Sequence, residues 1–184
     1  AFAADPLIRA LVPDDAVYEE TALEMFKFFL WVFDLCQLTY VVEEVKCAAV
    51  WEGTAQSLRV LGRMVRLVAW MFGTWGVKCT LRWLDFFKTS DEFRTKHAAG
   101  AYHLLFLGTH VDSQGRGAGS KVLAPMLAKA DEEGVACYLE NSNEKNTPFY
   151  EKHGFKVIEQ IYPFKDWPEY AKDKGPVLTL MKRD

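Results

Sequence analysis

Apolar residues recur with helical spacing in the first half of this chain, and that spacing predicts three helices around one hairpin. Residues 6–10 close a first helix, and a second is predicted over residues 16–37, with Asp15 as its cap. Residues 39–43 and 47–51 have the composition of two strands joined by a tight turn at residues 44–46. Residues 55–97 are predicted to be mainly helical, with a break near residues 73–76.

The second half of the chain alternates strand-like and helix-like segments. An apolar run over residues 102–111 predicts a buried strand, in which Gly108 could mark a bulge. A helical repeat follows as far as residues 131–133, and Gly134 is a good helix terminator. Residues 135–140 form a second short strand, so this strand–helix–strand unit favours parallel pairing. Two more strands are predicted near residues 155–161 and 176–182.

The most informative segment is the loop between the first of these strands and its helix. Residues 114–120 read Gln-Gly-Arg-Gly-Ala-Gly-Ser, so three alternate glycines stand at the start of a helix. Backbone N–H groups there can point at one anion, and a pyrophosphate is the expected ligand. The loop fits neither a Walker sequence, since no Lys-Ser/Thr follows, nor the Gly-x-Gly-x-x-Gly dinucleotide fingerprint, since Ser120 occupies the third glycine position.

The loop does match Gln/Arg-x-x-Gly-x-Gly/Ala, and in this it resembles the coenzyme A signature of the GNAT acetyltransferases. Residues 138–155 are similar to that family's next segment, in which a strand leads to a short helix carrying Asn, Phe and Tyr, and Gly-Phe opens a further strand. The nearest likeness within the family is the puromycin N-acetyltransferase group. The resemblance covers residues 100–184 closely and the earlier part of the chain loosely.

This resemblance implies an α+β fold with three α/β/α layers over residues 1–184 as one domain. Its sheet would be mixed and mostly antiparallel, with splayed parallel central strands. The family's first strand is absent from its expected place, which would leave the strand near residues 39–43 as an unpaired edge. A trimmed chain, a shorter sheet and a partner that covers the edge all remain open explanations.

Acetyl-CoA is the cofactor that the resemblance implies. The diphosphate would bind the backbone of the glycine-rich loop, Arg116 would add a charge and Ser120 a hydroxyl. The pantetheine arm would pair with the end of the preceding strand, and Asn146 would hydrogen-bond it, although helix capping is its alternative role. The expected cofactor-binding residues are Thr109, His110, Val111, Gln114, Gly115, Arg116, Gly117, Ala118, Gly119, Ser120, Asn146 and Tyr150.

Tyr150 matches the family's general acid, which protonates the leaving thiolate. The acceptor amine must lose a proton before it attacks, and Glu140 at the end of a parallel strand could take it directly or through water. His110 is the alternative base, whereas His153 is expected to cap the short helix. No Cys or Ser partner indicates a nucleophilic triad, so direct transfer within a ternary complex is expected.

The predicted function is acetyl transfer to a primary amine, of a small molecule by analogy with the antibiotic-modifying group. Acetylation of a protein or peptide, or a catalytically silent acyl-CoA-binding module, are the alternatives. Candidate acceptor-pocket residues are Phe29, Trp31, Phe33 and Asp34, each equally explicable as helix core or cap. The long loop over residues 162–175 either lines that pocket or packs on its own Phe164 and Trp167.

Composition and charge narrow the partners further. A net charge of −3 argues against a nucleic-acid surface, and the longest apolar run, residues 28–33, is too short to cross a bilayer. Arg and Trp residues within residues 55–97 could indicate a helix on a membrane surface, but an amphipathic helix packed on the sheet is the favoured interpretation. Cys36, Cys47, Cys79 and Cys137 lack metal-ligand spacing, so we expect no metal and a reducing, cytoplasmic setting. A monomer or a homodimer is expected.

Overall fold

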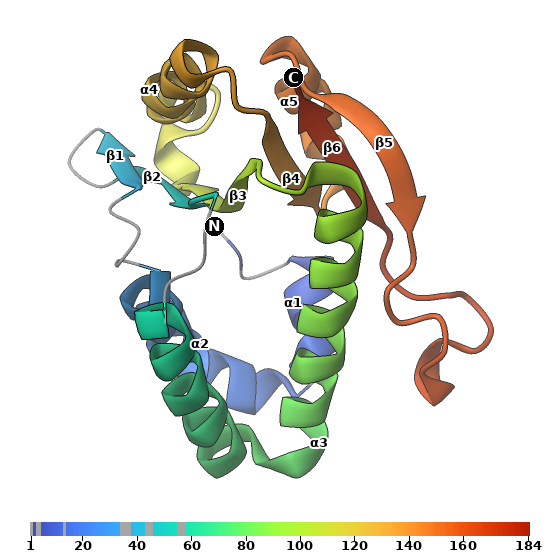
Figure 1. Ribbon diagram of the computed structural model, residues 1–184. Coiled ribbons are helices and arrows are strands. Elements are labelled where there is room, and N and C mark those ends of the chain that lie inside the picture. The colour runs from blue at the N-terminus through green and yellow to red at the C-terminus, as the bar shows by residue number, and fades with distance from the viewer. Residues whose placement is uncertain (1, 3–4, 13, 34–37, 43–45, 55–57) are drawn as a thin grey trace.

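A computed structural model describes residues 2, 5–12, 14–33, 38–42, 46–54 and 58–184. Its helices and strands follow the predicted order, with short 3₁₀ turns between some of them (Figure 1). The helices are α1 (Pro6–Leu11), α2 (Asp15–Phe33), α3 (Leu58–Ala98), α4 (Ala118–Glu133) and α5 (Thr147–Lys152). The strands are β1 (Thr39–Val42), β2 (Cys47–Glu52), β3 (Tyr102–Thr109), β4 (Cys137–Asn141), β5 (Lys156–Ile161) and β6 (Leu178–Arg183).

The described strands form one six-stranded sheet in the order β1-β2-β3-β4-β6-β5. Only β3 and β4 run parallel, because α4 crosses between them, and the other described neighbours are antiparallel. Helices α4 and α5 lie on one side of the sheet, and α1, α2 and α3 lie on the other (Figure 1). Each side has its own buried apolar cluster. The predicted three-layer α+β fold with a mixed, mostly antiparallel sheet is therefore confirmed.

The parallel pair is short, and this opens the centre of the sheet. Pairing runs only from Tyr102 opposite Cys137 to Leu104 opposite Leu139, after which β3 and β4 separate. The predicted splay is present, but the bulge that we expected at Gly108 lies elsewhere. Gly108 pairs regularly with Ala48, whereas Leu105 has no partner on β2 because the register shifts between Val50 and Trp51. The bulge thus coincides with the point where β3 loses β4 as its neighbour.

Helix α3 has two arms that meet at a sharp bend (Figure 1). Gly76 adopts φ 74° and ψ −179° there, which no continuous helix allows and which glycine tolerates because it lacks Cβ. The predicted break in this helix is confirmed. Both arms contribute to the buried apolar cluster on this face of the sheet, through Leu67, Met71, Trp83 and Phe86. The favoured interpretation of a packed helix therefore holds.

The N-terminal cap of α2 differs from the prediction. The helix begins at Asp15, and the Asp14 carboxylate accepts a hydrogen bond of 3.1 Å from the N–H of Val17. An N-cap residue precedes the first helical residue, so the earlier start moves the cap from Asp15 to Asp14. Residues 34–37 of the predicted helix, and most of the hairpin turn at residues 44–46, lie outside the described residues.

The long connection after β5 packs on itself and on α3. Phe164 is fully buried, and its ring stacks on Trp167 at 4.3 Å between centroids. The indole N–H of Trp167 donates to Asp85 at 3.0 Å, and Arg82 forms an ion pair with Glu169. Residues 162–175 therefore follow the self-packing interpretation.

Candidate active site

The glycine-rich loop has the backbone shape that an anion cradle requires. Gly115 and Gly117 have φ values of 73° and 81°, in the left-handed region that favours glycine. Gly117 caps α4 without a side-chain hydrogen bond. Among the described residues, no group accepts a hydrogen bond from the first three N–H groups of α4, those of Ala118, Gly119 and Ser120. These donors and the positive end of the helix dipole suit a phosphate group.

The flanking side chains leave the mouth of the cradle open. Arg116 is exposed and forms no ion pair with a described carboxylate, so its charge is available at the surface of the loop. The Gln114 side chain instead donates to the carbonyl of Thr109 at 3.3 Å and ties the loop to the end of β3. Ser120 is half-buried in the first turn of α4.

A close contact joins the loop to the short helix α5. A Cβ atom on Gly119 would lie 3.1 Å from Cζ of Phe149 and 3.3 Å from its Cε2, so only glycine fits there without a shift of the ring. Phe149 immediately precedes Tyr150 on α5, and the two rings lie 5.2 Å apart. The loop therefore contacts α5 at the residue next to Tyr150.

The strand end expected to pair with the pantetheine arm is only partly strand. Thr109 ends β3, while Val111 begins a 3₁₀ turn, and His110 lies between them as its N-cap. The N–H of His110 donates to the carbonyl of Lys46 at 2.7 Å, so this donor is already used. The backbone freed from pairing with β4 begins further back, after Leu104.

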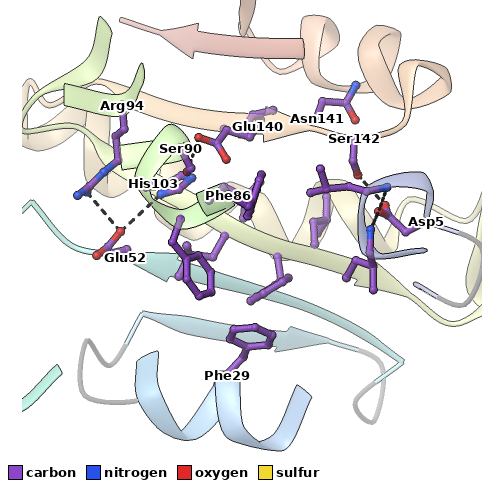
Figure 2. A pocket seen from close by; sticks show the side chains of 18 of the residues that line it. Asp5, Phe29, Glu52, Phe86, Ser90, Arg94, His103, Glu140, Asn141 and Ser142 are labelled. Atoms are coloured by element: carbon purple, nitrogen blue, oxygen red, sulfur yellow. Dashed lines mark hydrogen bonds and ion pairs between the residues drawn. The ribbon is translucent and has the colours of Figure 1, made fainter. Parts of the chain in front are cut away.

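A cavity of about 410 Å³ lies beside the splay, between β3, β4 and the helices α1, α2 and α3 (Figure 2). Its apolar wall is rich in rings: Phe2, Phe29, Trp83, Phe86, Phe87 and Phe106. Its polar groups include Asp5, Glu52, Ser90, Arg94, His103 and Glu140. Tyr150 and Asn146 line it as well. The predicted general acid, the predicted base Glu140 and one predicted cofactor contact therefore meet at one cavity.

Tyr150 is buried, at 8% exposure, on the α5 side of this cavity. Its phenol donates no hydrogen bond to a described residue. Burial, with a smaller contribution from the Asp5 carboxylate, raises the pKa of Tyr150 to about 12. The phenol therefore keeps its proton at neutral pH, as a general acid must. Asn146 occupies the N-cap position of α5 but makes no capping hydrogen bond, so its amide is not used by the alternative role.

Glu140 is a half-buried carboxylate on β4 just beyond the last parallel pair. Its Oε1 accepts hydrogen bonds from the hydroxyls of Ser90 (2.7 Å) and Tyr138 (3.1 Å). These neutral donors hold the carboxylate in place without neutralising its charge. His110 does not line the cavity and is exposed, whereas His153 caps α5 as predicted, with Nδ1 2.7 Å from the carbonyl oxygen of Phe149.

Two groups of polar side chains in the cavity escaped prediction. Asp5 caps α1 by accepting from the N–H groups of Leu7 and Ile8, and it also accepts from Ser142 at 2.6 Å, which fastens α1 to the segment after β4 (Figure 2). In the second group, Arg94 Nη1 lies 3.3 Å from Glu52 Oε2, and His103 Nδ1 lies 3.5 Å from the same oxygen. For this second group, the only signal in the sequence was His103, a polar residue within an otherwise apolar strand.

The predicted acceptor residues divide between two places. Phe29 lines the cavity and is 2% exposed. Trp31 lies outside this cavity: it is 36% exposed and lines an outer groove with Phe28 and Arg66. Residues two positions apart on a helix are separated by about 200° around its axis, so both cannot face the same cavity. The side chain of Phe33, and Asp34, lie outside the described residues. No residue of 162–175 lines the described cavity.

Residues 83–157 match the sequence model of the family described as acetyltransferase (GNAT) domain. This span holds the glycine-rich loop, the splayed strands and α5. Over these residues the chain therefore resembles a GNAT acetyltransferase domain. It is also 24% identical over 179 residues to the N-acetyltransferase C550.08 of Schizosaccharomyces pombe, a match that covers 90% of this chain and 70% of that relative. Together these findings support an acyl-CoA-dependent acetyltransferase.

Solved structures extend the GNAT likeness to the fold. A Corynebacterium glutamicum structure described as histone acetyltransferase HPA2 and related acetyltransferase aligns with a TM-score of 0.60 at 20% identity. That alignment covers 100% of this chain and 84% of the other. An Agrobacterium tumefaciens putative acetyltransferase aligns over 45% of this chain and 55% of its own length, with a TM-score of 0.36 and 22% identity. The Corynebacterium glutamicum alignment, which covers the whole chain, shows that the fold is that of the GNAT acetyltransferases.

Within the described residues, no helix combines the length and the apolarity that a bilayer span requires. Cys47, Cys79 and Cys137 are free thiols, and Cys36 lies outside the described part of the chain.

Proposed function

We propose that this GNAT protein transfers an acetyl group from acetyl-CoA to a primary amine of a small molecule, by direct attack in a ternary complex. The observation that carries this proposal is the position of Tyr150. Tyr150, whose phenol is protonated, lines the cavity beside the splay, and its neighbour Phe149 contacts the glycine-rich loop at Gly119. One bound thioester could therefore meet both the cradle and the acid.

The cofactor would bind in two parts. The diphosphate would accept hydrogen bonds from the N–H groups of residues 115–120, with Arg116 and Ser120 beside it. The pantetheine arm would follow the free edge of β3 from residues 109–111 toward the bulge, with Asn146 as a further partner. A backbone N–H near Leu105, which lacks a β2 partner, would stabilise the oxyanion. Such a donor contributes on the order of 3 kcal/mol in comparable enzymes.

The acceptor would enter from the cavity side. Glu140 would attract the ammonium group, which must pass one proton to a base of the cavity, directly or through water, before it can react. When the neutral amine attacks the carbonyl carbon, the C–N bond forms and the C–S bond breaks. Tyr150 gives its proton to the thiolate, and the resulting phenolate recovers one from the nitrogen.

The shape of the cavity supports a small acceptor over a peptide. Phe29 of α2 packs on Trp83 of α3, which in turn contacts Phe86, so the space is bounded by packed aromatic side chains. Such walls suit a compact body with apolar surface. The proposal includes an acceptor similar to those of the antibiotic-modifying group. It also includes a cytoplasmic location for the protein and a monomeric or homodimeric state.

Replacing Tyr150 by Phe tests the proposal, because it removes the acid and keeps the ring. We expect kcat to fall by about 100-fold or more, while the Kd for acetyl-CoA, measured by calorimetry, changes less than about twofold. Turnover is measured by thiol release and by mass spectrometry of the acetylated product, over panels of small amines and of peptides.

The panels separate the alternatives. Turnover confined to peptides would replace the small-molecule acceptor by a peptide. Equal, negligible turnover of wild type and Tyr150→Phe on every amine, with intact acetyl-CoA binding, would favour a silent binding module.

A further inference from the structure

His103 is a buried polar side chain whose surroundings do not satisfy it. It is 6% exposed, and its ring lies tilted against Tyr138 with 5.2 Å between centroids. Its Nδ1 is sealed from solvent and makes no hydrogen bond to a described residue, although Glu52 Oε2 is 3.5 Å away. Buried polar atoms without a partner are rare in folded proteins, and each calls for an explanation such as a catalytic role. His103 lines the same cavity as Tyr150 and Glu140.

Glu52 is placed to orient this ring. It is 6% exposed at the end of β2, and Arg94 Nη1 approaches its Oε2 at 3.3 Å while Nη2 donates to Asp91 at 2.9 Å. The Arg94 guanidinium therefore forms an ion pair with this carboxylate. An ionised Glu52 opposite Nδ1 favours the tautomer with the proton on Nδ1. The lone pair then lies on Nε2, which makes no hydrogen bond with any described residue.

We propose that His103 is the catalytic base that receives the proton of the acceptor ammonium, and that Glu52 is its positioning residue. This inference rests on the proposed function and assigns the proton acceptor of that reaction. Glu140, whose Oε1 already accepts two hydroxyl hydrogen bonds, then holds the ammonium by charge.

The proton balance of the transfer is complete with these groups. The ammonium loses one proton to His103 Nε2, directly or through water, and becomes the neutral amine. The amine attacks the thioester carbon, Tyr150 protonates the departing thiolate, and the tyrosinate takes the second nitrogen proton. His103 releases its proton to solvent between turnovers, so one amide, one thiol and one proton are produced.

Histidine suits this step because its charge changes nearer to neutral pH than that of a carboxylate. Glu52 on β2 and Tyr138 on β4 lie against its ring. The other charged groups nearby line the same cavity: Arg94 and Asp91 on α3, and Glu140 on β4. Glu52 is the nearest of these charges to Nδ1, so Glu52→Gln removes the negative charge beside the ring.

Three variants test the assignment in the full chain. His103→Asn keeps a donor toward Glu52 and removes the base, and His103→Gln is the second variant in case the first does not fold. Glu52→Gln keeps size and removes charge. The matched control is His97→Asn, since His97 Nε2 lies 3.0 Å from Glu159 in another histidine–glutamate pair, outside the cavity. Each protein is assayed for kcat against pH with the best amine of the panel, and for its Kd for acetyl-CoA.

We expect His103→Asn and His103→Gln to lower kcat by about 100-fold or more and to abolish the acidic limb of the pH profile. Glu52→Gln should shift that limb to lower pH, which a purely structural role would not do. His97→Asn should match wild type, and the Kd for acetyl-CoA should stay within about twofold throughout. The inference would be overturned if the His103 variants kept wild-type turnover and the acidic limb of the pH profile, or if that limb did not move in Glu52→Gln. The acetyltransferase proposal would then remain intact. That proposal fails only if the wild-type protein itself shows no turnover.

Discussion

Single glycines set the geometry of the loop, each for a different reason. Gly115 and Gly117 need positive φ, and no atom would obstruct a Cβ at either position. Gly119 has an ordinary backbone, but Phe149 occupies the space that a side chain would need. Sequence alone could predict the first requirement from the alternation of glycines. The second depends on how α5 packs, and no local pattern encodes that contact.

Gly119→Ala should push the Phe149 ring by a few tenths of an ångström, and with it Tyr150. We expect a several-fold fall in kcat, and we expect Gly119→Ala/Phe149→Leu to recover most of it, because leucine leaves room for the new methyl group. Contacting residues couple in this way, and steady-state kinetics of the two single variants and the double variant measure the coupling. Additive effects in the double variant would show that the contact does not transmit to Tyr150.

The residues that carry charge in the cavity were the hardest to predict. Tyr150 and Glu140 lie in segments with a recognisable pattern, so both reached the list of candidates. Glu52 and His103 lie near the ends of their strands, where a single polar residue is as consistent with a solvated strand end as with a site. Only the pairing of β2 with β3, which sets Glu52 opposite His103, brings them together.

At the scale of elements, the positions of glycines predicted helix ends better than hydrophobic spacing did. Gly134 ends α4 in the left-handed conformation as expected, and the break in α3 falls at Gly76. The bulge in β3 was misplaced to Gly108, because a glycine is only one way to accommodate a bulge. The actual irregularity follows from where the neighbouring strand diverges, which is a property of the sheet.

The bend in α3 predicts opposite effects for two neighbouring glycines. Gly73 lies in the helical arm, and no atom lies within 4 Å of the place that a Cβ atom would take, so Gly73→Ala should stabilise the protein by up to about 1 kcal/mol. Gly76 has φ 74°, so Gly76→Ala should destabilise it by about 1–2 kcal/mol. Urea denaturation followed by circular dichroism measures both. Equal stabilisation by the two substitutions would mean that α3 is continuous in solution.

At the scale of the whole molecule, the cavity is built from segments that are far apart in the sequence. Asp5 from the start of α1, Glu52 from β2, Arg94 from α3 and Glu140 from β4 meet at one space (Figure 2). The glycine-rich loop, by contrast, is contiguous and could be identified from residues 114–120 alone. The proposed cofactor-binding loop could therefore be named from the sequence alone, whereas the cavity proposed for the acceptor depends on the packing of three helices on the sheet.

The most direct test of this account is a crystal structure of the full chain with acetyl-CoA bound. We expect the diphosphate oxygens within hydrogen-bonding distance of the N–H groups of residues 115–120, and the thioester sulfur about 3–3.5 Å from the Tyr150 hydroxyl, with the acetyl group facing the cavity. A diphosphate bound away from this loop, or a sulfur beyond the reach of Tyr150, would contradict the account.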